Sequence, residues 1–207
     1  MPERQGSSEK GEQAMAILNA AERLFFAQGY NGTSMRTIAK EAGYRSVAGL
    51  YNHFADKEAI FEGLIRARQP YDDIIAQVQA LNGDTPEELI SGIFQSLTQL
   101  MDAHMDFFRL VMIDYLEFGA IHVRELINDI RDRIYGMVQR ITPVANLSEE
   151  VPPIVFIRLM GIQVFGYVMT KNIMPESFLG LLSDEQWRSY TLDLILNGMV
   201  GIKGVQQ

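Results

Sequence analysis

The segment from Tyr44 to Phe54 carries side chains that can recognise the edges of DNA bases. Arg45 can hydrogen-bond a guanine edge if its guanidinium faces the groove. Val47 either turns inward or contacts a thymine methyl group. The groove-facing candidates share a small or polar side chain, and they are Arg45, Ser46, Ala48, Gly49 and Asn52. Together these residues suggest direct reading of bases in the major groove.

Two short helices separated by a turn at Gly43 are expected to position these side chains. In the first helix, Ile38 and Ala42 recur four residues apart, and the small Ala39 beside them allows close approach of a second helix. Gly43 can adopt the left-handed conformation that ends a helix. The pattern over Thr33–Phe54 is typical of a helix-turn-helix.

The second predicted helix divides into an apolar and a polar face. The apolar stripe recurs at i, i+3, i+4 and i+7 and comprises Val47, Leu50, Tyr51 and Phe54. The other face is small or polar and carries Ser46, Gly49, Asn52 and His53. A helix that enters the major groove needs one face for anchoring and one for bases. Spacing alone fits this interpretation and a plain packing hairpin about equally.

The flanking sequence favours the DNA-binding interpretation. Upstream, a helical face ends before Gly29, and it is built from Ile17, Leu18, Ala21, Leu24 and Phe25. Downstream, Asp56 is expected to be the N-cap of a further helix. FFAQGYNGTSMRTIAKEAG, LYNHF and ADKEAIF follow in that order, and over residues 12–65 the chain resembles the tetracycline-repressor (TetR) family of bacterial transcriptional regulators. Leu50 and Tyr51 lie one residue further from Gly43 than is usual in that family.

Other candidates would hold the DNA backbone rather than read bases. Thr33 is a predicted N-cap whose hydroxyl could also meet a phosphate, and Arg36 in the first turn could reach the backbone. Tyr51, His53 and Lys57 resemble the family's backbone-contacting positions. For each residue the alternative is a cap, a structural side chain or an ordinary surface charge.

Composition bounds the class of protein. The chain has 207 residues, 47% of them hydrophobic, so a substantial core is expected. The absence of cysteine excludes disulfides and thiolate chemistry and fits a cytoplasmic location. The net charge is -8, but the first 60 residues hold seven basic and seven acidic residues, so the negative charge lies beyond them. Local phosphate contact is compatible with an acidic distal part.

The sequence predicts an all-α fold in two domains. Residues 1–11 are expected to form a flexible tail, residues 12–56 a three-helix DNA-binding domain with the helix-turn-helix, and residues 57–207 a larger helical domain for effector binding and dimerisation. Further helices are predicted at Asp56–Ala67, Tyr71–Leu81, Thr85–Asp102, Met105–Phe118, His122–Ile141, from Pro152 and at Asp184–Gly198. No sustained strand pattern is present.

The segment after Pro152 is apolar nearly all round, although Arg158 and Gln163 interrupt it. Such a helix must be covered on every side in a soluble protein. We infer that it pairs with the last helix and with their copies in a second subunit; the alternative is the centre of the monomer's own core. The predicted dimer interface comprises Ile157, Gly161, Val164, Leu192, Ile195, Leu196 and Met199.

The family resemblance implies a small-molecule pocket in the larger domain. Its candidate lining is Phe94, Leu97, Met101, Phe108, Met112, Tyr115 and Phe165, each of which could equally be ordinary core. Polar groups nearby are His104, Arg109, Asp114, Glu117 and His122. The expected effector is apolar or amphipathic.

The expected function is a transcriptional regulator, by family habit a repressor. It would bind a double-stranded, pseudo-palindromic DNA operator as a homodimer and be released by an effector. An enzyme is not expected, because the three histidines are far apart and no HExxH, P-loop or nucleophile elbow occurs. No cofactor, metal or membrane is expected. The alternative is a helical protein-interaction module that does not bind DNA.

Overall fold

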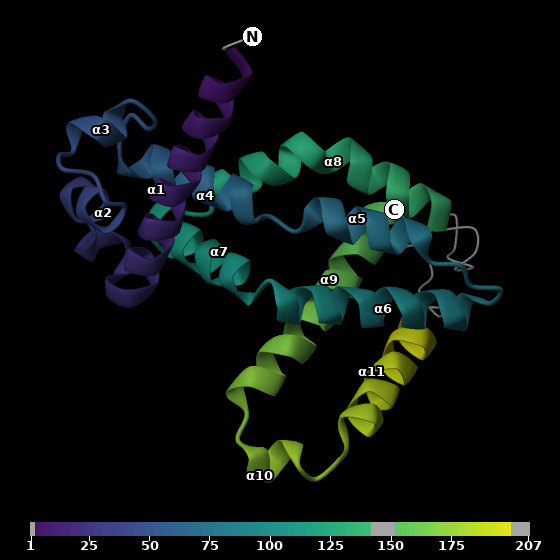
Figure 1. Cartoon of the computed structure of the whole chain (residues 1–207). Coiled ribbons are helices and arrows are strands. Elements are labelled where there is room, and N and C mark those ends of the chain that lie inside the picture. The colour runs from purple at the N-terminus through teal and green to yellow at the C-terminus, as the bar shows by residue number, and fades with distance from the viewer. Residues whose placement is uncertain (1–2, 142–151, 200–207) are drawn as a thin grey trace. The chain divides into compact units, whose positions relative to one another are not determined.

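A computed structural model describes residues 3–141 and 152–199 (Figure 1). All regular structure in those residues is helical, and the all-α prediction is confirmed. The helices are α1 (Glu3–Gly32), α2 (Met35–Glu41), α3 (Ala48–Tyr51), α4 (Lys57–Arg68), α5 (Tyr71–Ala80), α6 (Pro86–Ala103), α7 (Met105–Phe118), α8 (Ile121–Ile141), α9 (Pro153–Ile173), α10 (Glu176–Leu179) and α11 (Asp184–Met199).

Three local features differ from the sequence-based expectation. Helix α1 begins at Glu3, within the segment predicted to be a flexible tail. The sequence predicted that the first helix ends at Gly29. In the structure Gly29 has a φ of 77° and kinks α1, which continues to Gly32. The short α10 was not predicted, because four residues are too few to display helical periodicity.

The chain divides into two compact units. Unit 1 comprises Met1–Gln69 and Asp106–Ile127, and unit 2 comprises Pro70–Met105 and Asn128–Gln207. The predicted boundary after residue 56 therefore differs from this division, in which α4 belongs with α1. The reason is that α4 buries Ile60, Phe61 and Leu64 completely, and α1 is one of its main packing partners.

Aromatic rings form the centre of unit 1. Phe61 of α4 lies edge-on to Phe25 of α1, with ring centroids 5.7 Å apart. Tyr30 and Phe118 meet at 4.8 Å, and Phe118 stacks on Phe61 at 5.3 Å. Such pairs add to the burial of apolar area, which is the main stabilising term. This cluster joins the end of α1 to α4 and α7.

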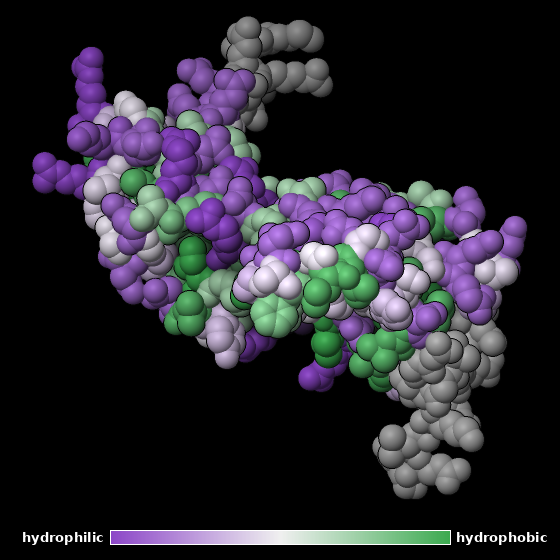
Figure 2. Space-filling model, turned by 90° about the horizontal axis from the view of Figure 1, so that it is seen from below, coloured by the Kyte–Doolittle hydropathy of each residue, from purple (hydrophilic) through white to green (hydrophobic). Residues whose placement is uncertain are grey.

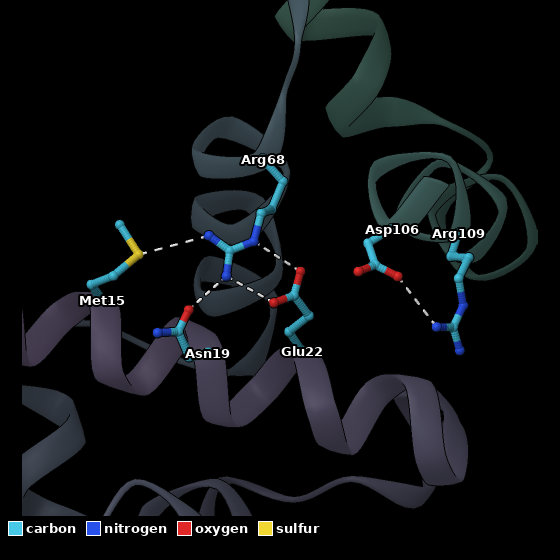
Figure 3. Close-up of polar contacts among 6 residues, drawn as sticks. All are labelled: Met15, Asn19, Glu22, Arg68, Asp106 and Arg109. Atoms are coloured by element: carbon cyan, nitrogen blue, oxygen red, sulfur yellow. Dashed lines mark hydrogen bonds and ion pairs between the residues drawn. The ribbon is translucent and has the colours of Figure 1, made fainter. Parts of the chain in front are cut away.

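Polar contacts fasten the other end of α4 to α1 (Figure 3). The Arg68 guanidinium donates to both carboxylate oxygens of Glu22, at 2.9 and 2.8 Å, and to the Asn19 amide oxygen at 2.6 Å. Donating these hydrogen bonds to Glu22 raises the pKa of Arg68. A two-point guanidinium–carboxylate pair of this kind is short and directional, so it fixes the register of α4 against α1.

A buried carboxylate closes the corner between α7 and α8 in unit 1. Asp114 is fully buried; one of its oxygens lies 2.6 Å from Nδ1 of His122, and the other accepts the backbone N–H of Val123 at 2.9 Å. The remaining ring nitrogen of His122 lies 3.5 Å from Glu58 of α4. Both oxygens of Asp114 and both ring nitrogens of His122 therefore have a polar neighbour within unit 1.

Helix α6 is central to unit 2 and packs on α9, α5 and α11. It buries Ile90, Ile93 and Phe94. Against this layer, α9 and α11 bury one face each, made of Phe156, Met160, Val164, Val168 and Ile195. Figure 1 shows α9 and α11 as the two arms of a hairpin with α10 at its base.

This packing corrects the predicted dimer interface. Val164 and Ile195 are only 6% and 1% exposed, so they belong to the core of the chain itself. Gly161 is exposed, whereas Ile157, Leu192 and Leu196 are half-buried, and the side chain of Met199 lies outside the described residues. Val164 and Ile195 were assigned wrongly because a helix apolar all round gives no signal about which face points inward; for the other positions the interface stays a prediction.

A different set of apolar side chains is exposed in unit 2. On α9 and α11 it includes Ile154, Ile162, Phe165, Ile173, Tyr190 and Leu194, and around α10 it includes Met174, Phe178 and Leu181. Figure 2, which views the molecule from below, shows apolar patches between the polar ones. By length and composition, the stretch Ile154–Ile173 is also able to cross a membrane, and 22% of its most apolar window is buried.

The predicted ligand-lining residues are divided between the two units. Phe94 and Met101 are buried in unit 2 and Leu97 is half-buried there, while Phe165 is exposed. Phe108, Met112 and Tyr115 belong to unit 1, where Tyr115 is 64% exposed and Met112 is also exposed. Side chains this open do not line an enclosed cavity. Of the polar groups, Asp114 and His122 are buried but engaged with each other.

Candidate nucleic-acid interface

Ser34, not Thr33, is the N-cap of α2. The Ser34 hydroxyl accepts the backbone N–H of Thr37 at 3.1 Å, and the Thr37 hydroxyl accepts the backbone N–H of Ser34 at 2.9 Å. Thr33 is only 2% exposed and donates its hydroxyl to the Gly29 carbonyl. The predictions of Thr33 as cap and as phosphate contact are therefore wrong, because its side chain points into the kink of α1.

The turn after α2 has the hydrogen bonds of a Schellman motif. The N–H of Tyr44 donates to the Ala39 carbonyl at 2.8 Å, and the N–H of Gly43 donates to the Lys40 carbonyl at 3.2 Å. Gly43 has a φ of 81°, which a residue with a side chain rarely adopts. The predicted role of this glycine is confirmed.

The second helix is shorter than predicted. α3 is a single turn, Ala48–Tyr51, continued to Phe54 by turn hydrogen bonds from His53 and Phe54 to the Leu50 carbonyl. Leu50 is completely buried and anchors this turn. Tyr51 is 57% exposed, so it does not belong to the inward stripe, although its exposure suits the backbone contact that the resemblance implied.

The predicted contact residues differ in accessibility. Exposed are Arg36, Arg45, Ser46, Ala48, Tyr51 and Asn52; half-buried are Val47, Gly49, His53 and Lys57. All of them lie in unit 1, on α2, on the turn, on α3, directly after α3 or at the start of α4. The chain therefore presents most of the predicted set to solvent in one domain.

A hollow between α2 and the following turn gathers positive charge. Arg36, Lys40 and Arg45 line it together with Tyr44, Ser46 and others, and no carboxylate does. Sequence reasoning missed Lys40, although its spacing four residues after Arg36 places both on one helical face. Despite the net charge of -8, this surface is locally suited to an anion such as a phosphate.

A second hollow brings the start of α1 to the region after α3. Glu9, Lys10 and Gln13 of α1 line it with Asn52 and His53, so it holds one charge of each sign. Lys10 was assigned to a tail by sequence, so its place beside two predicted DNA contacts was not foreseen. It is the fourth exposed cation in this part of unit 1.

Lys57 has a different role from the predicted one. Its ammonium donates to the carbonyls of Tyr30 and Thr33, at 2.8 and 2.9 Å, and lies 3.9 Å from the centre of the Tyr30 ring. Burial lowers the pKa of Lys57. A cation at the carbonyl end of a helix is stabilising, so Lys57 fastens the end of α1 rather than standing free for a phosphate.

Gly49 is needed because Tyr44 lies against it. A Cβ at residue 49 would approach Cδ1 of Tyr44 to 2.3 Å, far closer than any real contact. The Tyr44 hydroxyl in turn lies 3.4 Å from Nε2 of His53. The aromatic ring therefore bridges the turn and the end of α3, a role that no sequence signal indicated.

Replacing Gly49 by Ala should displace this ring and lower the free energy of unfolding by about 1–3 kcal/mol, the usual cost of overpacking. Chemical denaturation measures the change. In a Tyr44→Ala background the same replacement should be neutral or stabilising, because Ala favours helix over Gly by about 1 kcal/mol. Equal losses in both backgrounds would contradict the packing explanation.

Helix-turn-helix proteins are the class that this geometry defines, since a glycine turn sets one short helix against another beside a row of cations. Comparison with known proteins agrees: residues 17–64 match the family model described as bacterial regulatory proteins, tetR family. Residues 17–64 are thus similar to the DNA-binding domain of that family. The resemblance inferred from the sequence motifs is thereby confirmed.

Individual relatives are consistent with this assignment. The HTH-type transcriptional repressor BepR of Brucella suis is 36% identical over 88 residues, 42% of each chain. The HTH-type transcriptional repressor KstR2 of Mycobacterium tuberculosis is 31% identical over 102 residues, 48% of each chain. Each match thus spans less than half the length of the relative. A TetR family transcription regulator of Marinobacter aquaeolei shares the fold over 95% of this chain and 97% of its own, with a TM-score of 0.60 and 18% identity.

Proposed function

We propose that this protein is a DNA-binding transcriptional regulator, a cytoplasmic repressor that holds its operator as a homodimer and releases it when a small molecule binds. The observation that carries the proposal is the hollow lined by Arg36, Lys40 and Arg45 without a carboxylate, in the same unit as the exposed Tyr51 and Asn52. The curated relatives are named as repressors, which supports the same direction.

The dimer is proposed from the exposed apolar face of unit 2. Ile162 and Phe165 are three residues apart on α9, and Tyr190 and Leu194 are four apart on α11, so each pair lies on one helical side. Exposed apolar side chains gathered in this way are typical of a surface that another chain covers. A two-fold dimer would present two copies of α3 to half-sites about 34–36 Å apart, or a multiple of that spacing.

A gel-shift titration on DNA upstream of the protein's own gene tests the proposal. If six to ten phosphates are contacted, affinity should fall by about 10³- to 10⁵-fold between roughly 50 and 200 mM salt. Replacing Arg36 or Lys40 by Ala should weaken binding to all sequences and reduce the salt slope by about 1 for each contact. Replacing Arg45 or Asn52 should change which sequence is preferred.

A matched control is Arg66→Ala. Arg66 is also an exposed arginine of unit 1, but it pairs with Glu62 on α4 and does not line the cationic hollow. Binding that is independent of salt, or equally weakened by the control, would reject the regulator. It would favour the helical protein-interaction module instead.

A further inference from the structure

Unit 2 contains a cavity that none of the predicted site residues lines. It lies among α9, α10 and α11 and has a volume of about 340 Å³. Its walls include Tyr167 and Met174 from the α9 side, Leu179 from α10 and Trp187 from α11. A mostly apolar cavity of this size is typical of small-molecule sites.

The two aromatic walls are held in place by contacts of their own. The Trp187 indole N–H donates to the Leu179 carbonyl at 2.9 Å, which ties α11 to α10. The Tyr167 ring lies edge-on to Phe94 of α6, with centroids 5.5 Å apart, and burial raises the pKa of its phenol. The cavity is therefore largely preformed, which reduces the entropy cost of binding a ligand.

The polar groups of the lining indicate what kind of ligand fits. Thr170 and Thr191 donate their hydroxyls to carbonyls of their own helices, at 2.6 and 2.8 Å. Lys171 and Asp184 contribute one charge of each sign, and the Lys171 ammonium already lies 3.6 Å from the Asp102 carboxylate. Gln163 adds an uncharged amide. The opposite charges of Lys171 and Asp184 give the lining no net charge, so it favours a neutral ligand, and Trp187 and Tyr167 offer that ligand two aromatic walls.

Gly166 leaves part of the α9 wall open. A Cβ added at this residue would meet no heavy atom within 4 Å. The glycine lies one turn before Thr170 on the same helix and lines the cavity. A larger side chain at residue 166 would thus occupy the space without clashing with the protein.

We propose that the cavity between α9, α10 and α11 binds an uncharged, largely apolar aromatic compound that packs against Trp187. The role of the compound as effector rests on the proposed function; its binding to the cavity does not. α9 and α11 also carry the exposed apolar face of the proposed dimer, so a ligand wedged between them would set the spacing of the two interface helices.

Trp187 is the only tryptophan of the chain, so tryptophan fluorescence comes from a single residue in the wall of this cavity. The test titrates the full chain, without DNA, with the neutral dye N-phenylnaphthylamine and measures energy transfer from Trp187. Saturable transfer is expected. The sulfonated analogue anilinonaphthalene sulfonate should bind at least about tenfold more weakly, a difference of about 1.4 kcal/mol.

Gly166→Leu should weaken binding of the neutral dye at least about tenfold. Gly136→Leu is the matched control, since Gly136 is another helical glycine of unit 2 with nothing within 4 Å of an added Cβ, and it lies on α8 outside the cavity. Circular dichroism and size-exclusion chromatography establish that both variants are folded.

Absence of saturable transfer, or equal dye affinity in Gly166→Leu and parent, would overturn the inference. A Gly166→Leu variant that binds the dye as the parent does but changes its oligomeric state would also overturn it. That result would mean that residue 166 contacts a second copy of the chain and not the dye. A protein that binds the dye as described but ignores DNA would keep the inference and reject the proposed regulator. The two failures are therefore distinguishable.

Discussion

Replacing Asp114 by Ala should lower the free energy of unfolding by about 3 kcal/mol, the range expected when one partner of a buried polar pair is removed. Asp114 is fully buried and accepts from both His122 and the backbone N–H of Val123. Without the carboxylate, both donors remain in a dry corner with no partner. Urea unfolding of the parent and variant measures the loss.

Asp106→Ala is the matched control, because Asp106 is an aspartate on the same helix with a side chain 66% exposed. Its loss should change stability by no more than about 0.5 kcal/mol, since exposed ion pairs contribute little. His122→Phe should also be severe, and the double variant should cost less than the sum of the two single ones. Additive effects would show that the two side chains do not act as a pair.

Replacing Ile162 and Leu194 by Glu should convert the proposed dimer to monomers. Both side chains are more than half exposed, on α9 and α11, so charge at these positions costs the monomer little but would be desolvated in an interface. Operator affinity should fall by about 10²- to 10⁴-fold, because the second half-site is lost. Analytical ultracentrifugation and gel shift measure the two effects.

Leu116→Glu provides the comparison, since Leu116 is 77% exposed but lies on α7 in unit 1. It should leave both association and DNA affinity unchanged. A parent protein that is monomeric, or that floats with lipid vesicles through the apolar stretch Ile154–Ile173, would reject the dimer. The double variant that stays dimeric would place the interface elsewhere.

Helices whose ends are marked by a glycine, a proline or a capping hydroxyl were predictable from the sequence. The predicted bounds Met105–Phe118 match α7, because Gly119 takes a φ of 64° and stops the helix. The start of α6 follows from Thr85, whose hydroxyl accepts the N–H of Glu88, and from Pro86 in the first turn. In each case a single residue type decides the geometry without help from distant parts of the chain.

Choices between neighbouring or equivalent residues were not predictable. Thr33 and Ser34 both carry a hydroxyl that can cap a helix, and only the packing that buries Thr33 selects Ser34. The sequence predicts Lys57 to be a free surface cation, whereas in the structure its ammonium binds carbonyls at the end of α1. On α9, apolar residues on all sides concealed that Val164 faces inward and Phe165 outward. Tertiary contacts decide all three.

Helix α4 is attached to α1 at both of its ends. Lys57 at its first turn holds the carbonyl end of α1, and Arg68 at its last turn holds Glu22 and Asn19 in the middle of the same helix. The 12-residue helix between them is roughly 18 Å long at 1.5 Å per residue. Because both ends of α4 are bonded to α1, we expect a displacement of α4 to move α1 with it, and with α1 the helix-turn-helix that packs on it.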